Sequence, residues 1–178
     1  MVRAPWLGAA AAGVQRDAPV ELVDVMPTVL ELAGVPPPAG EALDGQSLAS
    51  LIAGGPPPPR NFSLSVYPRC PANTNDTSKM WMDNACLEVE RTAFFSMGAS
   101  VRTTEWRYTE WARWNGTAPD WGAPLIGAEL YSHAGDDGTS FDGAFEVVNL
   151  AEDPAHAAVR AQLSRLLRAA YSGGGQAP

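Results

Sequence analysis

The stretch "MGASVRTTEWRYTEW", Met97–Trp111, decides the fold that we expect for this chain of 178 residues. Its two halves are rich in aromatic and β-branched residues, which favour strands. The halves meet at Thr104 and Glu105, too closely for anything but a tight turn. The sequence therefore predicts a β-hairpin, with strands over 94–103 and 106–114.

Polar and apolar side chains alternate along this hairpin. Val101 and Tyr108 fall on one side, whereas Arg102, Arg107 and Trp111 fall on the other. Such a period of two is typical of a half-buried sheet. Because aromatic and β-branched cross-strand pairs stabilise a sheet by roughly 0.2–1 kcal/mol each, packing alone accounts for the density of aromatic residues.

Three further segments carry a clear pattern. "FSLSVY" (62–67) and "GAELYSH" (127–133) have the composition of strands. "AHAAVRAQLSRLLRAAY" (155–171) has the period of an amphipathic helix, with arginines mostly opposite its apolar stripe. The predicted stripe consists of Ala158, Ala161, Leu163, Leu166, Leu167 and Ala170.

The first third of the chain predicts two helices. Apolar spacing indicates a helix over 25–33, with Asp24 as its N-cap and Gly34 as a left-handed C-cap. A short helix is expected in "LASLIAG" (48–54), capped by Ser47. Glycine and proline runs then end the helical pattern.

The N-terminus has two interpretations. "VRAPWL", Val2–Leu7, reads as a short strand that Pro5 confines to an edge. A signal peptide matches residues 1–13 poorly, because Pro5 interrupts a short apolar stretch. We therefore expect a strand followed by a loop, with any secretion signal upstream of Met1.

Composition excludes some classes of partner. The chain has 12 basic and 20 acidic residues, a net charge of -8, which argues against nucleic acid or an anionic membrane as a partner. No run approaches the roughly 20 apolar residues of a membrane span. An apolar content of 46% allows a packed core.

Two cysteines and three Asn-x-Ser/Thr sequons indicate an oxidising, glycosylating compartment. The sequons begin at Asn61, Asn75 and Asn115, all in loop-like contexts. A disulfide between Cys70 and Cys86 would close a loop of about 15 residues and contribute roughly 3 kcal/mol. Two free buried thiols are the alternative.

An ordered series of motifs resembles the sulfatase family of the alkaline phosphatase superfamily, most closely the C-terminal part of iduronate 2-sulfatase-like enzymes. The predicted hairpin at Met97–Trp111 carries the most specific part of this likeness. The likeness runs from about Val2 to Tyr171. The other matching pieces are "APVELVDVMPTVLELAGVPPP" (18–38), "LDGQSL" (43–48), "VYPRC" (66–70), "GAELYSH" (127–133) and "NLAEDP" (149–154).

The resemblance implies an α+β fold: a small four-stranded antiparallel sheet with the C-terminal helix packed on it, preceded by a remnant strand and helices of a large α/β catalytic domain. The expected divisions are the end of that domain (1–55), a Pro-rich connector (56–61), the sheet-and-helix subdomain (62–172) and a disordered tail (173–178). A Cys70–Cys86 bridge would fit family members that close the loop after the "YPR" strand.

The resemblance also implies sulfate ester hydrolysis, on sulfated uronic acid or glycosaminoglycan-type sugars, in a lysosomal or secreted enzyme. Family enzymes use a formylglycine made from C/S-x-P-x-R, together with calcium. Neither Cys70 nor Cys86 lies in such a motif, and the only lysine is Lys79. We therefore expect no catalytic residue, metal site or bound cofactor in this chain, and an inactive C-terminal piece whose partner is its missing catalytic domain.

Substrate contacts are the remaining candidates. Arg102, Trp106 and Arg107 could reach the substrate pocket of the intact enzyme, since Arg pairs with carboxylate or sulfate groups. Each is also explained as a structural residue. Asp136 and Asp137 fall in a Gly-rich loop without the spacing of a calcium loop, so a solvated turn is expected.

Two non-enzymatic functions stay open at this stage. A standalone secreted carbohydrate-binding module would need Trp106, Trp111 and Trp114 on one solvent-facing platform. A remnant or interaction protein would need only a soluble fold. The exact sugar, the oligomeric state and the true start of the protein do not follow from the sequence.

Overall fold

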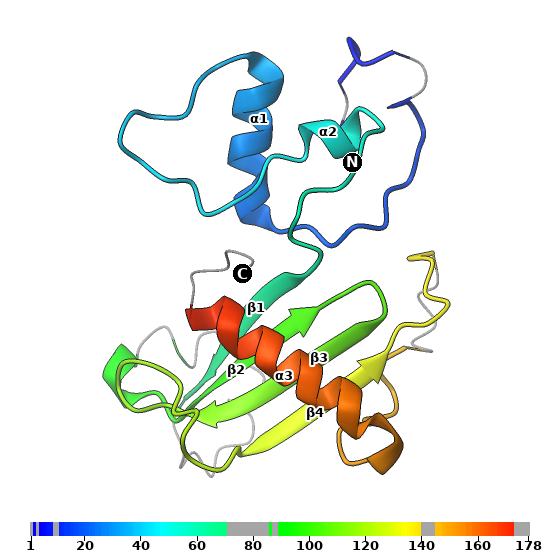
Figure 1. Cartoon of the computed structure of the whole chain (residues 1–178). Helices are drawn as coiled ribbons and strands as arrows, with labels where there is room; N and C mark the ends of the chain where they lie inside the picture. The colour runs from blue at the N-terminus through cyan, green and yellow to red at the C-terminus, as the bar shows by residue number, and fades with distance from the viewer. Residues whose placement is uncertain are drawn as a thin grey trace.

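The computed structural model describes residues 2, 4–8, 11–70, 86, 89–139 and 145–172. It divides into a helical region near the N-terminus and a sheet region that carries the last helix (Figure 1). The elements are η2 (Leu22–Asp24), α1 (Val25–Ala33), α2 (Ala49–Ile52), β1 (Ser63–Arg69), η5 (Arg91–Ala93), β2 (Ser96–Arg102), β3 (Trp106–Arg113), β4 (Gly127–Ser132), η6 (Pro154–His156) and α3 (Ala157–Ser172).

The sheet is an antiparallel meander in the order β1-β2-β3-β4. The β2–β3 hairpin pairs Arg102 with Arg107, and the Thr103 N–H donates to the Trp106 carbonyl at 2.8 Å. α3 lies across one face of the sheet (Figure 1). The expected α+β fold, a four-stranded sheet with a packed C-terminal helix, is therefore confirmed.

The core lies between the sheet and α3. Strand alternation directs one set of side chains toward α3, where each large one buried contributes roughly 1.5–3 kcal/mol. Within the predicted helical stripe Ala158 and Ala161 are instead exposed, because α3 is rotated so that Val159 packs inward. The buried cluster consists of Phe62, Ala99, Val101, Tyr108, Leu130, Ala151, Leu163, Leu167 and Ala170.

A buried carboxylate ties α3 to the sheet. Glu110 on β3 is 1% exposed and accepts hydrogen bonds from Tyr108 Oη (2.9 Å), Ser164 Oγ (2.6 Å) and Arg168 Nε (2.8 Å). Burial, with the nearby Glu110 charge, raises the pKa of the Tyr108 hydroxyl. Because its oxygens are bonded to three side chains, Glu110 is a structural group.

The helical region ends as predicted and begins earlier than predicted. Gly34 has φ 66°, the left-handed conformation expected of a C-cap. Asp24 occupies the N-cap position of α1, as predicted, but its side chain makes no capping hydrogen bond, and with helical dihedrals it also ends η2. The Asp24 carboxylate instead binds Arg60 and the Gln46 N–H, so it does not cap the backbone N–H groups of α1. Ser47 does accept from the Ala49 N–H at 3.2 Å, at the start of α2.

A buried ion-pair cluster joins the two regions. Arg60, at the end of the Pro-rich connector, donates to both carboxylate oxygens of Asp24, at 2.6 and 2.5 Å, and pairs with Glu21. Asp24 also accepts from the Gln46 N–H at 2.9 Å, and Glu21 accepts from the Leu64 N–H. The helical region is therefore fixed to the start of β1.

The expected strand at Val2–Leu7 is not formed in the described residues there. Ala4–Leu7 make a turn closed by a hydrogen bond from the Leu7 N–H to the Ala4 carbonyl at 3.0 Å. A strand needs a neighbouring strand for its backbone groups. No described strand lies alongside this segment, which accounts for the wrong prediction.

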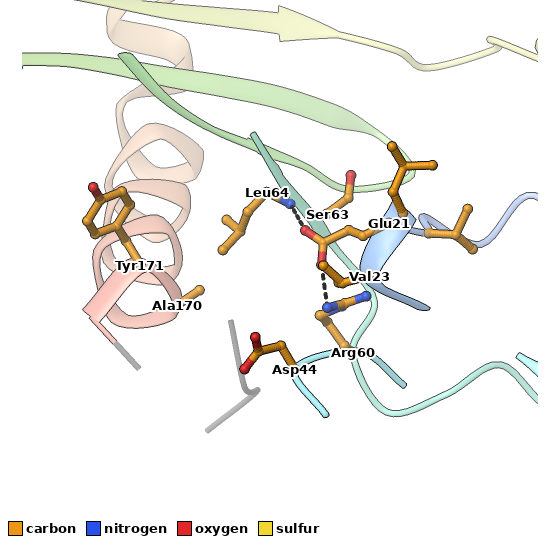
Figure 2. Close-up of a pocket in the computed structure, with 10 residues that line it drawn as sticks. Glu21, Val23, Asp44, Arg60, Ser63, Leu64, Ala170 and Tyr171 are labelled. Atoms are coloured by element: carbon orange, nitrogen blue, oxygen red, sulfur yellow. Dashed lines mark hydrogen bonds and ion pairs between the residues drawn. The ribbon is translucent and has the colours of Figure 1, made fainter. Parts of the chain in front are cut away.

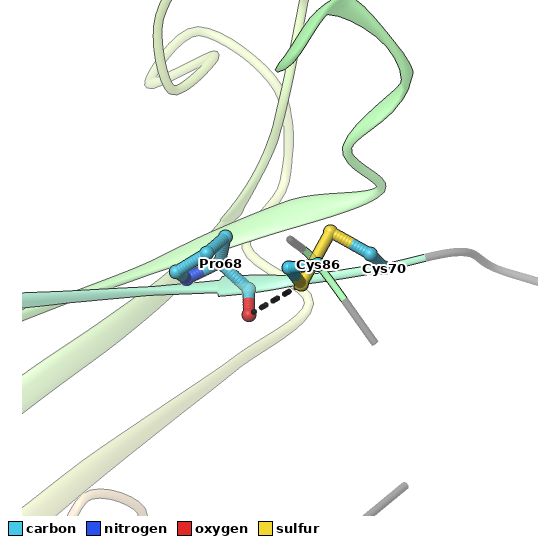
Figure 3. The surroundings of a disulfide bond; sticks show 3 residues. All are labelled: Pro68, Cys70 and Cys86. Atoms are coloured by element: carbon cyan, nitrogen blue, oxygen red, sulfur yellow. Dashed lines mark hydrogen bonds between the residues drawn. A yellow bond between two sulfur atoms is a disulfide. The ribbon is translucent and has the colours of Figure 1, made fainter. Parts of the chain in front are cut away.

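A disulfide joins Cys70, just after β1, to Cys86, with 5.4 Å between their Cα atoms (Figure 3). The Cys86 sulfur also lies 3.5 Å from the Pro68 carbonyl oxygen (Figure 3). Much of the loop that the bridge closes, with Asn75 and Lys79, is outside the described residues, as is the predicted tail 173–178. No described helix is long and apolar enough to cross a membrane.

Candidate functional site

The end of the β2–β3 hairpin gathers the charged residues that the sequence analysis selected. Arg102 and Arg107 are direct cross-strand partners and therefore lie on the same face of the sheet, opposite α3. Arg102 Nη2 is 3.5 Å from Asp136 Oδ2, and Arg107 Nε is 2.8 Å from Glu146 Oε1. Both guanidinium groups thus have a carboxylate partner.

His133 connects the two ion pairs. Its Nδ1 is 2.7 Å from Asp136 Oδ2, and its Nε2 is 2.8 Å from Glu146 Oε1. The ring is 7% exposed and stacks on Phe145 with centroids 5.7 Å apart. Both ring nitrogens therefore lie within hydrogen-bond distance of a carboxylate oxygen. Sequence reasoning missed this role: Asp136 is only three residues from His133, but Glu146 is thirteen residues away.

These contacts and burial shift the pKa values of Asp136 and Arg102. The hydrogen bond from His133 lowers the pKa of the Asp136 carboxyl, helped by the Gly138 N–H. Burial, and then repulsion from Arg107, lowers the pKa of the Arg102 guanidinium. Asp136 therefore holds His133 and Arg102 in place, which is more than the solvated turn predicted for this loop.

Trp106 does not join this group. It lies on the face that α3 covers, with its ring edge-on to His156 and centroids 5.5 Å apart. Trp111 lies on the opposite face because it is five residues further along β3, and Trp114 is only 8% exposed. The three tryptophans therefore do not form one platform, which removes the feature that a carbohydrate-binding module required.

A hollow beside this cluster runs between the hairpin end and the N-terminal segment. Segment 15–20 lines one side, and the 102–105 and 133–138 loops line the other. Gln15 spans it by donating to the Asp137 carbonyl at 2.7 Å. Its lining includes Arg102 and the Asp136–His133 pair, but no side chain in it has the contacts of an activated nucleophile.

A second hollow lies where the two regions meet (Figure 2). Glu21 and Arg60 face each other inside it, while Ala170 and Tyr171 of α3 form the far wall (Figure 2). The Arg60 guanidinium is already occupied here, because it is bound to Glu21 and Asp24. This hollow is a structural junction.

In the part of the chain that the structure describes, the residues do not fit the calcium of a sulfatase. Among the residues that the structure describes, no three His, Cys, Asp or Glu side chains are grouped so that they could hold a metal ion. The best-placed carboxylates, Asp136 and Glu146, are already bonded to His133 and to arginines. Both cysteines are in the disulfide.

Comparison with known proteins identifies the class of this fold. No model of a known protein family matches the sequence. Arylsulfatase K of Danio rerio is 44% identical over 69 residues, which is 36% of this chain and 13% of that protein.

Solved structures match over more of the chain. A structure reported as a sulfatase from Bacteroides thetaiotaomicron has a TM-score of 0.52 and 24% identity over 85% of this chain. A 2-O GAG sulfatase has a TM-score of 0.51 and 25% identity over the same share. The chain spans 24% of the length of each of these structures.

These likenesses confirm the predicted resemblance to sulfatases. The fold is that of a sulfatase C-terminal subdomain. Over these stretches the chain is similar to sulfatases, of which it spans only a part.

Proposed function

We propose that this chain is the C-terminal portion of a sulfatase that hydrolyses sulfate esters, and that the catalytic domain lies in sequence outside these 178 residues. The observation that supports this most is the fit of 85% of the chain to 24% of a 2-O GAG sulfatase. The formylglycine and calcium expected of such an enzyme would belong to the catalytic domain. The isolated chain is then inactive.

The proposed substrates are sulfated sugars of the uronic acid or glycosaminoglycan type, as for iduronate 2-sulfatase-like enzymes. The hairpin motifs support this class, and one structural relative is a 2-O GAG sulfatase. A further structure with the same fold holds its substrate D-glucosamine-2-N,6-O-disulfate, at 18% identity. Arg102 and Arg107 are the proposed substrate-side groups, because they share a face and are held by acids. Trp106 lies on the opposite face and would act only through packing on the side of α3.

The proposed partner is the missing catalytic domain, and its docking surface is the apolar face of η2 and α1. Leu22 is 90% exposed, Val25 and Met26 are 52% exposed, and Val29 is 56% exposed. Their spacing places them on one helical face. Exposed apolar stripes of this kind mark interaction surfaces. The division of the chain at the connector 56–61 belongs to this proposal.

A lysosomal or secreted location is part of the proposal. The Cys70–Cys86 disulfide supports an oxidising compartment. Asn61 and Asn115 are exposed, as an acceptor for glycosylation must be. Mass spectrometry of protein from its native source, before and after glycosidase treatment, tests the sequons at Asn61, Asn75 and Asn115.

Two experiments test the proposed function. Genomic DNA upstream of the Met1 codon is expected to encode an in-frame C-x-P-x-R motif. Purified Met1–Pro178 is expected to give no turnover of 4-methylumbelliferyl sulfate, whereas protein that includes the upstream part gives calcium-dependent turnover. Robust calcium-dependent turnover by the 178 residues alone would overturn the proposal.

A further inference from the structure

Three exposed arginines gather at one end of the sheet, in a chain whose net charge is -8. Arg69 ends β1 and pairs in register with Ser96, which pairs in turn with Arg113 near the end of β3. Arg91 lies in η5, just before β2. These three guanidinium groups place positive charge at this end of a chain that is acidic as a whole.

Each of these arginines lies against an aromatic ring. Arg69 is 4.9 Å from the ring centroid of Trp111 and 5.4 Å from that of Tyr67. The guanidinium carbon of Arg113 is 5.6 Å from the ring centroid of Phe95, and that of Arg91 is 5.5 Å from the ring centroid of Trp114. A stacked guanidinium uses its flat face and keeps its edge N–H donors available to an anion.

These arginines differ from the pair at the other end of the hairpin. Arg102 and Arg107 are bound to Asp136 and Glu146. In the part of the chain that the structure describes, Arg69, Arg91 and Arg113 make no ion pair with an acid.

The ring beneath Arg69 is itself fixed. Trp111 lies over Gly98, where a Cβ would be only 2.6 Å from the indole. The indole N–H donates to Glu129 Oε1 at 2.8 Å, which sets the ring's orientation. The Arg69 guanidinium is thus held before any ligand arrives, so less side-chain entropy is lost on binding.

We propose that this arginine–aromatic end, defined by Arg69, Arg91 and Arg113, binds a saccharide chain that carries several sulfate groups. Two strand spacings, about 10 Å, separate the backbones of Arg69 and Arg113, so a ligand with several separated anionic groups fits better than a single ion. Planar guanidinium edges match sulfate oxygens in pairs. The inference rests on the proposed function, in which a sulfated saccharide is the substrate. It assigns that saccharide a contact site on the protein apart from Arg102 and Arg107.

The test is calorimetric titration of the 178-residue chain with a heparin hexasaccharide at low salt. The variant Arg69→Gln/Arg113→Gln is expected to bind about tenfold more weakly or worse, since two charge-assisted contacts are lost. Arg160→Gln/Arg165→Gln is the matched control, because it removes the same charge from α3. Arg69→Lys keeps the charge but loses the planar stack, and is expected to weaken binding about threefold or more.

The same hexasaccharide after chemical desulfation is expected not to bind. Equal weakening by the two double variants would show general electrostatic attraction and overturn the proposal, as would the absence of binding to the wild-type chain. Circular dichroism of each variant verifies that the fold is kept. The result is independent of the proposed function's own test, because neither the upstream coding sequence nor turnover of the longer protein depends on these arginines.

Discussion

The sheet region and the helical region bury their apolar residues to very different degrees. In the sheet region Val101, Leu130 and Leu167 are fully buried against one another. In the helical region Leu22 of η2 is 90% exposed and Val29 of α1 is 56% exposed. The first region completes its own core, whereas the second presents an apolar face that another part of a larger protein would cover.

The largest expected effect comes from separating the two regions. Arg60→Met removes a side chain that is 2% exposed and leaves the Asp24 and Glu21 carboxylates without their cation. Because a buried charge is left unpaired, we expect a loss of about 3–5 kcal/mol in the free energy of unfolding, measured by urea titration. Asp24→Asn in the same background removes one of those charges and is expected to restore part of the loss. An unchanged midpoint for Arg60→Met would contradict the buried cluster.

The comparison itself is tested by truncating one leucine in each region. Leu167→Ala opens a cavity in the core and is expected to cost about 2–5 kcal/mol. Leu22→Ala is its matched control and is expected to change stability by less than about 0.5 kcal/mol, because Leu22 is exposed. Thermal and urea unfolding followed by circular dichroism measure both. Similar losses for the two variants would mean that the regions do not differ in burial.

A smaller effect is expected under Trp111. Gly98→Ala places a methyl group 2.6 Å from the indole, so the ring must move, at a cost of about 1–3 kcal/mol. Gly127→Ala, whose Cβ would lie 3.9 Å from the same ring, is the control and is expected to be nearly neutral. Near-ultraviolet circular dichroism and urea unfolding detect the displaced ring. Equal behaviour of the two variants would contradict the close contact at Gly98.

The smallest effect concerns pH. The folded state lowers the pKa of Asp136, through its bonds with His133 and the Gly138 N–H, so Asp136 adds stability above its unfolded pKa of about 3.9 and loses it as the pH falls through the lower folded value. Asp136→Asn is expected to unfold with a shallower pH dependence below about pH 4. Thermal melts from pH 2.5 to 6 measure this, and parallel curves for the two proteins would contradict it.

Local patterns were enough to predict the sheet region. Alternation fixed the faces of Tyr108 and Trp111, and helical spacing placed Leu163 and Leu167 in the core. These predictions succeeded because each element's pattern matches the face that it buries.

Contacts between distant segments could not be predicted in this way. Asp24 was taken for a helix cap because capping is the local use of an aspartate, whereas its partner Arg60 lies 36 residues away. His133 similarly needs Glu146 and the fold to bring them together. The strand expected at Val2–Leu7 depended on a neighbouring strand, which local sequence does not supply.

The buried Arg60 cluster changes the meaning of the proline run before it. Prolines 56–59 suggest a spacer between two bodies, but the residue that follows them is held to both η2 and the start of β1. Any rotation of one body about this spacer must first expose two carboxylates and a guanidinium to water. The cluster therefore opposes rotation about the prolines, and the surface carried by α1 is tied to the surface carried by the sheet.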